Sequence, residues 1–364
     1  MDALARLESS GIRYYLVSFS ALDRYFGHTP GDNIYVAVDG TLIDLAKSLG
    51  ELEYPGLEDW DAASRWGEGM VYYRCLQDEQ QPRRLTFAIM DFLYDPATDT
   101  FFDPNDAYRE LRGKAVPRSV PGRPALDVVL DAAVLSSRYG YEIAGTDLPE
   151  LGHLDAVPEA VQRRLLVDLL GSRSPTRGLQ LLHDTGVVQR IWPELAPMNE
   201  TSHSKEHHPE GNVWEHSIET LRYRKTPDLV LSLGLLFHDS GKPLATRTRD
   251  RVFDGHAEIG ADLARRVLRR LGFSSELVSD VAWLVTNHMF PGALHRLPPH
   301  RTDRLMRSRL FPVLLELYRC DLSSTFRGPD GYYRACRIYR SFLKNTSNPF
   351  RDAAGKKLVK LYVE

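Results

Sequence analysis

Two short stretches, HPEGNVWEH at residues 208–216 and LFHDSGK at residues 236–242, decide how the fold of this 364-residue chain is interpreted. They place His216 and the adjacent pair His238-Asp239 in segments that are otherwise largely apolar. A buried aspartate needs a compensating cation or several hydrogen-bond donors. A bound metal ion would supply that charge and would be held by the histidines as well. The second half of the chain is therefore predicted to carry a metal site.

Three further residues extend this set, namely His256, His288 and Asp321. In SELVSDVAWLVTNH (275–288) the valines recur at helical spacing and lead to His288, which places this histidine on the inward face. Asp321 likewise follows an apolar helical stripe. A single histidine or aspartate on such a face is ordinarily a core residue with its hydrogen bonds satisfied. The joint occurrence of all these residues favours a metal centre.

The composition describes an ordinary folded protein. Hydrophobic residues make up 43% of the chain and charged residues 26%, and the net charge is only −3, so any nucleic-acid contact has to be a local patch. The three cysteines are far apart and form no CxxC pair. No apolar stretch approaches the length of a membrane span, and the N-terminus has no signal core. We expect a cytoplasmic location and no membrane partner.

The order of strand-like and helical patterns predicts an α+β fold. Runs such as IRYYLVSF and LTFAIMDFLY (85–94) have the β-branched and aromatic character of strands, whereas later segments have apolar residues at helical spacing. SVPGRP (119–124) is a plausible hinge. The predicted division is a small α/β domain, an all-α neck, an all-α metal-binding domain and a C-terminal tail, with bounds 1–118, 119–204, 205–345 and 346–364.

The metal motifs resemble the HD superfamily of metal-dependent phosphohydrolases, and most closely the HD domain of CCA-adding tRNA nucleotidyltransferases. In that family HPEGxVWxH leads into LLHDxGK, and here the segments read HPEGNVWEH and LFHDSGK. The resemblance implies four core ligands and two additional ones, which are His216, His238, Asp239, Asp321, His256 and His288. It also implies one or two divalent ions, for which mixed imidazole and carboxylate ligands suit Mn, Fe, Co, Ni, Zn or Mg.

Several residues near these motifs are candidates for contact with a phosphorylated substrate. Lys242 follows Asp239 by three residues, and both are assigned catalytic roles; a lysine that complements a helix dipole is the alternative for Lys242. The remaining substrate-binding candidates are Arg247, Arg249, Arg251 and His208, and a solvated edge is the alternative for each arginine.

The first 200 residues also resemble CCA-adding enzymes and poly(A) polymerases, but with departures. The family pattern YLVGGxVRD reads YLVSFSALD here, so Ser18-Phe19 replaces Gly-Gly. The paired carboxylates of the family fall on Asn33 and Tyr35. Two-metal nucleotide transfer needs carboxylates to hold the ions. The sequence therefore predicts that the nucleotidyltransferase-like domain is degenerate and that its transferase activity is absent.

The leading hypothesis from sequence is a metal-dependent phosphohydrolase, of phosphatase or 2′,3′-cyclic phosphodiesterase type, that acts through the HD domain. Its expected partner is a nucleotide or an RNA 3′ end such as that of tRNA. One alternative is an active CCA-adding nucleotidyltransferase with atypical carboxylates, for which Asp32, Asp39 and Asp91 are candidates. The other is a non-catalytic RNA-binding protein with a structural metal, in which Arg163, Arg164, Arg173 and Arg177 are candidate RNA contacts.

Overall fold

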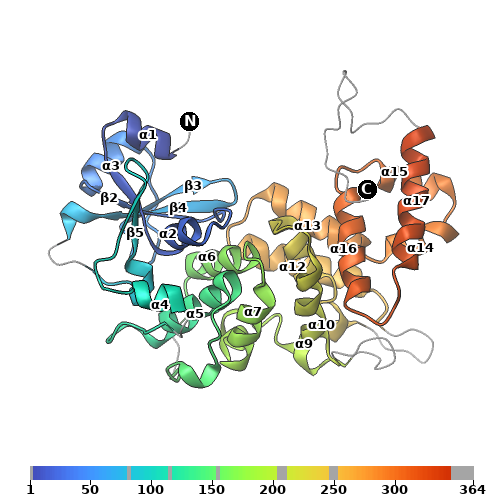
Figure 1. Ribbon diagram of the computed structural model, residues 1–364. Coiled ribbons are helices and arrows are strands. Elements are labelled where there is room, and N and C mark those ends of the chain that lie inside the picture. The colour runs from blue at the N-terminus through green and yellow to red at the C-terminus, as the bar shows by residue number, and fades with distance from the viewer. Residues whose placement is uncertain are drawn as a thin grey trace. The chain divides into compact units, whose positions relative to one another are not determined.

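The computed structural model describes residues 3–79, 83–113, 117–152, 156–202, 211–245 and 253–345. The chain divides into two compact units, Met1–Ile191 and Trp192–Glu364. Unit 1 combines a β-sheet with helices, and the described part of unit 2 is built from helices (Figure 1). This confirms the predicted α+β fold class. The finer division into four parts stays a prediction, and the helices predicted as a neck belong to unit 1 up to Ile191.

The described residues of unit 1 form a six-stranded sheet with the strand order β3-β4-β2-β1-β5-β6. The strands are β1 Tyr14–Leu16, β2 Ile34–Val38, β3 Ala62–Trp66, β4 Gly69–Cys75, β5 Leu93–Asp95 and β6 Thr100–Phe102. Strands β2 and β4 are parallel, with Tyr35 opposite Tyr72, and the other neighbours are antiparallel. A Cβ on Gly69 would lie 2.0 Å from the Asp32 carbonyl oxygen, so only glycine lets β4 start here.

Alternate residues of the strands face opposite sides of the sheet, as the pleat requires. On one side Val36 and Val71 pack into an apolar cluster with Leu7 of helix α1 (Ala3–Ser9) and Leu45 of helix α3 (Leu42–Leu49). On the other side Tyr35 lies in an aromatic group with Tyr72 and with Phe19 of helix α2 (Ser18–Phe26). The Tyr35 side is the one on which the polar site of unit 1 is built.

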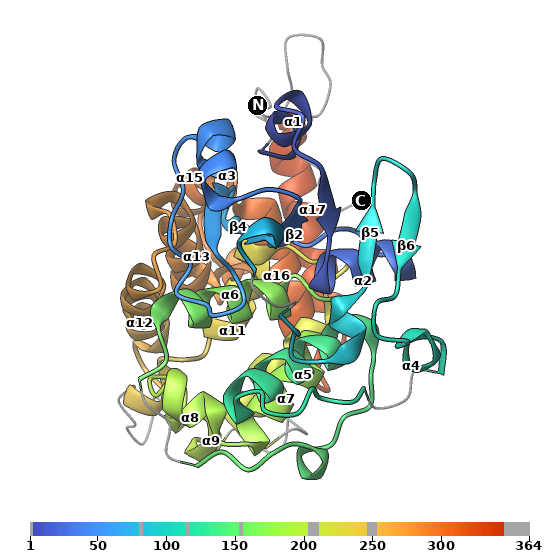
Figure 2. The ribbon, with the colours of Figure 1, turned by 90° about the vertical axis from the view of Figure 1, so that its left-hand side faces the viewer.

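Helices α5 (Ala125–Tyr139), α6 (Glu159–Leu170), α7 (Pro175–Asp184) and α8 (Val187–Ile191) complete unit 1 beside the sheet (Figure 2). Helix α7 packs closely against α5, because a Cβ on Gly178 would meet Ser137 Oγ at 2.2 Å. Shorter elements are α4 (Tyr108–Gly113) and the 3₁₀ turns η1 (Leu76–Asp78), η2 (Ala88–Asp91) and η3 (Gly145–Asp147). The strand predicted over 85–94 is wrong in part, since η2 occupies its centre and Asp91 accepts the Leu85 N–H there.

Unit 2 is organised around helix α11 (Leu229–Phe237), which is almost wholly apolar and is contacted by α10, α12, α13 and α16. The other long helices are α10 (Val213–Thr220), α12 (His256–Arg270), α13 (Ser275–Asn287), α15 (Pro299–Met306), α16 (Phe311–Ser323) and α17 (Asp330–Asn345). The short ones are α9 (Pro197–Glu200), α14 (Phe290–Ala293), η4 (Leu221–Tyr223), η5 (Lys242–Leu244) and η6 (Leu294–Arg296). Within the described residues, no helix has both the length and the apolar character to span a membrane.

Candidate metal centre

The ends of the helices around α11 bring the six predicted metal ligands together. His238 caps the C-terminal end of α11 and Asp239 follows it, whereas His256 is the first residue of α12. His288 caps the end of α13, and the remaining two ligands lie within α10 and α16. Because one ligand comes from each of several helix ends, the centre forms only when unit 2 is folded.

A glycine makes this convergence possible. A Cβ on Gly241 would lie 2.1 Å from the His256 carbonyl oxygen and 2.5 Å from the Gly260 nitrogen. The turn that follows Asp239 therefore passes directly against the first turn of α12. Any larger side chain at Gly241 would push the two ligand-bearing segments apart.

Three of the imidazole rings are fixed in one tautomer by main-chain carbonyl groups. The Nδ1 atoms of His238, His256 and His288 lie 2.7, 2.8 and 2.7 Å from the carbonyl oxygens three residues earlier in the chain. A carbonyl oxygen only accepts hydrogen bonds, so each Nδ1 carries the proton. In the neutral ring Nε2 then has the free lone pair, which is the form that binds a metal.

The Nε2 atoms of the four histidines face one another in two pairs at short range. His256 Nε2 and His288 Nε2 are 3.2 Å apart, and His216 Nε2 and His238 Nε2 are 3.3 Å apart. His256 and His288 each present an acceptor Nε2, and two acceptor nitrogens cannot hydrogen-bond to each other, so a proton or a cation has to lie between them. Ligand atoms held at roughly 2.1 Å from a common ion lie roughly 3 to 3.5 Å apart, which matches this spacing.

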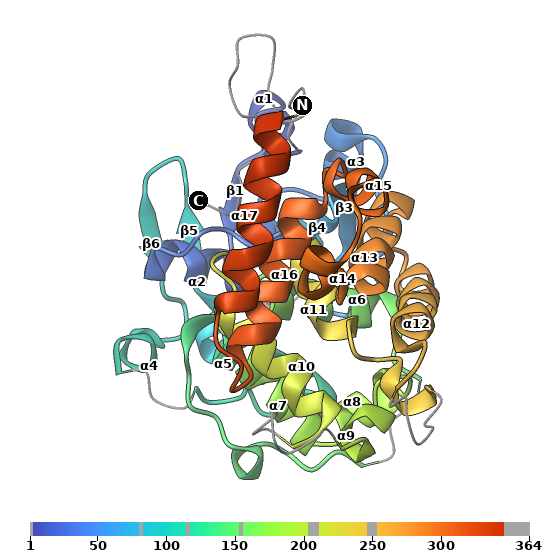
Figure 3. The same ribbon diagram turned by 90° about the vertical axis from the view of Figure 1, so that its right-hand side faces the viewer.

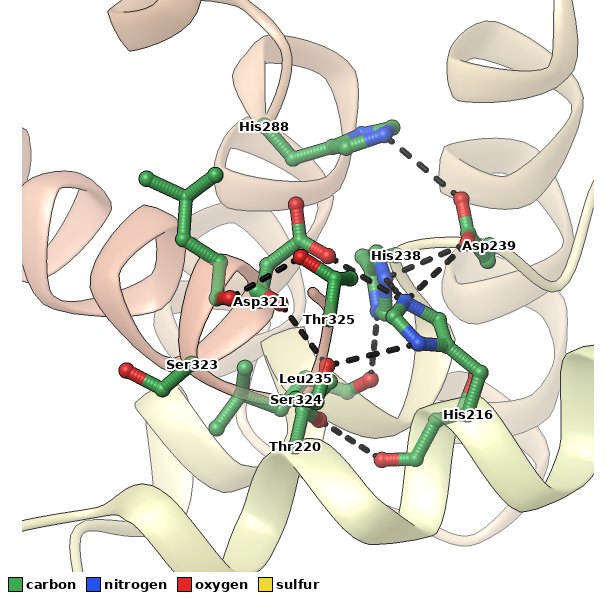
Figure 4. Close-up of polar contacts among 12 residues, drawn as sticks. His216, Thr220, Leu235, His238, Asp239, His288, Asp321, Ser323, Ser324 and Thr325 are labelled. Carbon is green, nitrogen blue, oxygen red and sulfur yellow. Dashed lines mark hydrogen bonds and ion pairs between the residues drawn. The ribbon is translucent and has the colours of Figure 1, made fainter. Parts of the chain in front are cut away.

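Asp239 faces both histidine pairs. Its Oδ2 lies 3.3 Å from His238 Nε2 and 3.7 Å from His216 Nε2, and its Oδ1 lies 3.6 Å from His256 Nε2 and 3.7 Å from His288 Nε2. The donor atoms fall into two groups, each within 4.8 Å: His216, His238 and Asp321, and Asp239, His256 and His288. Figure 4 shows Asp321 directed toward His216, at 3.1 Å from its Nε2, while Asp239 also faces His288. The donor set fits two divalent ions that share one carboxylate.

The protonation states also suit a metal. Burial lowers the pKa of His288 to about 4 and lowers that of His256. Burial opposes ionisation of Asp239, but the neighbouring His238 and Lys242 outweigh it and hold the pKa of this carboxyl well below its usual range. The centre thus presents the neutral imidazoles of His256 and His288 and the ionised carboxylate of Asp239, which are the forms that coordinate metal ions.

A cavity of about 240 Å³ opens from these ligands. Lys242 lines it and binds Asp239 Oδ2 at 2.5 Å, so its ammonium group is already engaged with a predicted ligand. Phe253, Met289 and Arg327 also line the cavity, and the sequence analysis did not identify them. No motif marked them, because they flank the ligands in space rather than in a fixed sequence pattern. Arg247, Arg249, Arg251 and His208 lie outside the described residues.

Asn33 and Tyr35 occupy the positions where the family has its paired carboxylates, and both form hydrogen bonds with Asp168. Asn33 Nδ2 donates to Asp168 Oδ1 at 3.0 Å, and the Tyr35 hydroxyl donates to Asp168 Oδ2 at 2.5 Å. Burial raises the pKa of Asp168 to about 6, although Arg164 and Tyr35 oppose that rise. A carboxylate from α6 therefore lies against the two neutral side chains of β2.

A second cavity, of about 270 Å³, lies in unit 1 between the sheet region and helices α5 and α6. Asp59, Asp127 and Asp131 line it together with Ser18 and Arg164. Ser18 Oγ is buried and has no hydrogen-bond partner among the described residues. Arg164 is buried and pairs with Asp131, and Arg163 is buried as well, so neither arginine lies on a solvated helix face. Arg173 and Arg177 are exposed.

The carboxylates considered for an atypical transferase site do not converge. Asp91 accepts hydrogen bonds from Arg84, Asn105 and the Leu85 N–H, and Asp39 accepts one from Gln77. Among the described residues, Asp32, Asp39 and Asp91 do not form a three-ligand group.

Comparison with known proteins gives these sites a context. Residues 213–308 match the HD domain family. The CC-adding tRNA nucleotidyltransferase of Thermus thermophilus is 36% identical over 188 residues, covering 48% of this chain and 41% of that protein. A multifunctional CCA protein of Xanthomonas campestris is 27% identical over 351 residues, covering 88% and 82%. The crystal structure of the Bacillus stearothermophilus CCA-adding enzyme in complex with CTP aligns with a TM-score of 0.51 at 17% identity, over 94% of this chain and 80% of that one.

Unit 2 thus contains the segment that matches the HD domain family, and the chain has the fold seen in a CCA-adding enzyme. The chain is a relative of the CCA-adding tRNA nucleotidyltransferases, which confirms the resemblance found in the sequence. The chain matches less than half of the length of the first relatives, 41% and 34%.

These relatives correct two predictions. Two of them are named as CC-adding and A-adding tRNA nucleotidyltransferases, which contradicts both a hydrolase acting through the HD domain and the absence of transferase activity. The predictions took the HD cluster as the only active centre and treated Asn33 and Tyr35 as decisive. They did not consider the cavity of unit 1 that Asp59, Asp127 and Asp131 line, because Asp59 lies far from the other two in the sequence.

Proposed function

We propose that this chain is a tRNA nucleotidyltransferase that adds nucleotides to the 3′ end of tRNA at the cavity of unit 1. The single observation that carries this proposal is that three carboxylates, Asp59, Asp127 and Asp131, line one cavity beside the sheet. The relationship to proteins named as CC-adding and A-adding tRNA nucleotidyltransferases supports it. The expected substrates are a tRNA 3′ end and a nucleoside triphosphate.

The carboxylates of this cavity have the electrostatics of a cation site. Burial raises the pKa of Asp127 to about 6, and the charge of Asp131 adds to that rise. Burial also raises the pKa of Asp59, against the effect of Arg123. Crowded, partly desolvated carboxylates are stabilised when a hard cation such as Mg²⁺ joins them. Such ions stabilise charge on phosphoryl oxygens during nucleotide transfer.

In this chain the side chains of β2 do not supply the metal-binding carboxylates. Asn33 and Tyr35 are neutral, and Asp168 is held between them by hydrogen bonds. Transfer in this chain therefore has to use the cavity carboxylates, with Ser18 Oγ and Arg164 as the polar groups that face a bound nucleotide.

The test is incorporation of radiolabelled CTP and ATP into a tRNA transcript that lacks its 3′ CCA end. Asp127→Asn is the variant of choice, because about a third of its side chain is exposed and its removal leaves no buried cation unpaired. We expect at least a hundredfold loss of incorporation, on the order of the effect of removing an electrostatic group in an active site. Asp39→Asn, at an exposed residue beside the sheet, is the matched control.

Loss of activity in Asp39→Asn but not in Asp127→Asn would place the chemistry elsewhere in unit 1. Absence of incorporation by the wild-type chain, with tRNA binding retained, would reject the transferase and leave an RNA-binding protein.

For unit 2 we propose that the HD cluster binds one or two divalent ions among Mn, Fe, Co, Ni, Zn and Mg. The proposed ligands are His216, His238, Asp239, His256, His288 and Asp321, with Asp239 shared. The short distances between the facing Nε2 atoms support this assignment. Elemental analysis of purified protein tests it, and a metal content below 0.1 ion per chain after incubation with each ion would reject it.

A further inference from the structure

Ser324 is a buried serine beside the metal centre and supplies none of its six proposed ligands. It is the C-cap residue of α16 and follows Asp321 by three residues, so both side chains lie on the same face of the helix. That face contacts His216 of α10 through both residues. Helix α16 packs against α11, and α17 lies along its outer side (Figure 3). The core of unit 2 therefore fixes the position of Ser324 relative to His216.

The hydroxyl group of Ser324 lies between a main-chain carbonyl group and an imidazole ring. It donates to the Asp321 carbonyl oxygen at 2.7 Å, and its Oγ lies 3.4 Å from His216 Nδ1 (Figure 4). A hydroxyl group has a single proton, and here the carbonyl oxygen accepts it. Toward His216 the Ser324 oxygen can therefore only accept a hydrogen bond, which requires a proton on Nδ1.

Two acceptors face the other nitrogen of this ring. His216 Nε2 lies 3.1 Å from Asp321 Oδ1 and 3.3 Å from His238 Nε2. The second of these is an acceptor because the Nδ1 atom of His238 donates to the Leu235 carbonyl oxygen. Without a metal ion, a proton on His216 Nε2 relieves the repulsion between these atoms. With a metal ion, the Nε2 lone pair becomes the ligand, and the neutral ring carries its proton on Nδ1.

The two sides of the His216 ring thus favour opposite tautomers. Asp321 and His238 favour a proton on Nε2, whereas Ser324 favours a proton on Nδ1. The exchange is balanced, because Nε2 releases one proton to solvent and Nδ1 takes one up. An interaction that stabilises only the tautomer able to bind the ion increases its population, and the affinity for the ion rises in proportion.

We propose that Ser324 is a positioning residue for the metal ion of His216 and Asp321, and that it acts by accepting the Nδ1 proton of His216. The inference rests on the proposed binding of metal by the HD cluster. It concerns one of the two ligand groups, because His256 and His288 direct their Nδ1 atoms to main-chain carbonyl groups. Those carbonyl groups survive any substitution, whereas the Ser324 hydroxyl group can be removed.

The test is a calorimetric titration of Zn²⁺ into the metal-free full chain. Ser324→Ala is expected to weaken one binding step about tenfold, at the lower end of the effect of removing a group that orients a metal ligand, because the 3.4 Å contact is long. This step is the one that Asp321→Asn also weakens. A step that involves His256 and His288 should change less.

The matched control is Ser323→Ala, one residue earlier on the same helix. Ser323 is exposed, and its hydroxyl group donates to the Arg319 carbonyl oxygen, but within the part of the chain that the structure describes it contacts no proposed ligand. This variant should bind Zn²⁺ like the wild type. The Tm of the metal-free chain should be the same for both alanine variants, which separates an effect on the ion from an effect on the helix end.

NMR of the Zn²⁺-loaded wild type with ¹⁵N-labelled histidine reports the tautomer without any substitution. The proton on His216 Nδ1 should exchange slowly with solvent, and this protection should be lost in Ser324→Ala. Equal Zn²⁺ affinities of Ser324→Ala and the wild type would overturn the inference, as would a rapidly exchanging Nδ1 proton in the wild type. Failure of the wild type to bind Zn²⁺ would instead reject the metal centre itself.

Discussion

The Nε2 atoms of His256 and His288 face each other at 3.2 Å, and the Nδ1 atom of each ring donates to a main-chain carbonyl. This contact is unfavourable between neutral rings and becomes favourable when a cation lies between them. A bound metal ion would relieve the repulsion between these two nitrogen lone pairs of unit 2. Its stability should depend on the ion.

Removal of metal is expected to lower the thermal stability of unit 2. At a free ion concentration one hundred times Kd, binding contributes about 2.7 kcal/mol, which corresponds to a shift in Tm of roughly 5 to 10 °C for a unit of this size. Scanning calorimetry with Mn²⁺ and with EDTA measures the shift, and His238→Ala should abolish it. Asp262→Asn on the exposed side of α12 is the control and should retain it.

Substitution of Gly241 tests the approach of the two ligand-bearing segments. In Gly241→Ala the new Cβ would meet the His256 carbonyl oxygen at 2.1 Å, so the turn has to move. We expect a loss of about 3 kcal/mol in the free energy of unfolding and a metal content below half that of the wild type. Gly328→Ala, where no atom lies within 4 Å of the new Cβ, should be nearly neutral. A stable, fully loaded Gly241→Ala variant would contradict the packing argument.

The buried ion pair between Asp23 and Arg138 links α2 to α5. Asp23 accepts from Arg138 Nε at 2.6 Å and from Nη2 at 2.5 Å. Asp23→Asn leaves a buried guanidinium group without its counter-charge, which is expected to cost about 3 to 5 kcal/mol of stability. Asp99→Asn breaks the exposed pair with Arg24 and should cost far less, because solvent screens that pair. Urea denaturation followed by tryptophan fluorescence compares the two, and equal losses would show that burial does not govern the cost.

The carboxyl group of Asp168 should make unit 1 more stable in mild acid. Its pKa is raised to about 6, mainly by burial, from an ordinary value of 3.8. Between pH 4 and pH 6 the folded state therefore binds the proton more strongly, and stability decreases as pH rises through this window, by about 1.4 kcal/mol for each pKa unit. The Asp168→Asn variant should lose this dependence. Urea denaturation at half-unit pH intervals measures it, and identical profiles for variant and wild type would contradict the assignment.

The metal centre was largely predictable because its ligands lie in continuous motifs. His288 and Asp321 each follow an apolar helical stripe, and such spacing directs these residues to the core. The rotation of the rings was not predictable, since it depends on main-chain carbonyl groups at the helix ends. The approach of Asp239 to both histidine pairs also depends on these helix ends.

The polar interior of unit 1 was not predictable in the same way. The helix containing Arg163 and Arg164 was predicted, but an arginine pattern on a helix ordinarily indicates a solvated face. Both are buried because Asp131 pairs with Arg164 and because the Glu68 carbonyl accepts from Arg163. These partners come from segments far apart in the sequence. The local sequence pattern therefore predicted the helix correctly but predicted the burial of its arginines incorrectly.

The position of Asp239 affects how two metal ions would bind one after the other. Its two oxygens serve different histidine pairs, so the first ion to arrive would draw the carboxylate toward itself and change the charge seen by the second. Occupancy of the two positions is then coupled through a single side chain. A titration followed by calorimetry would show two unequal steps rather than two identical, independent ones.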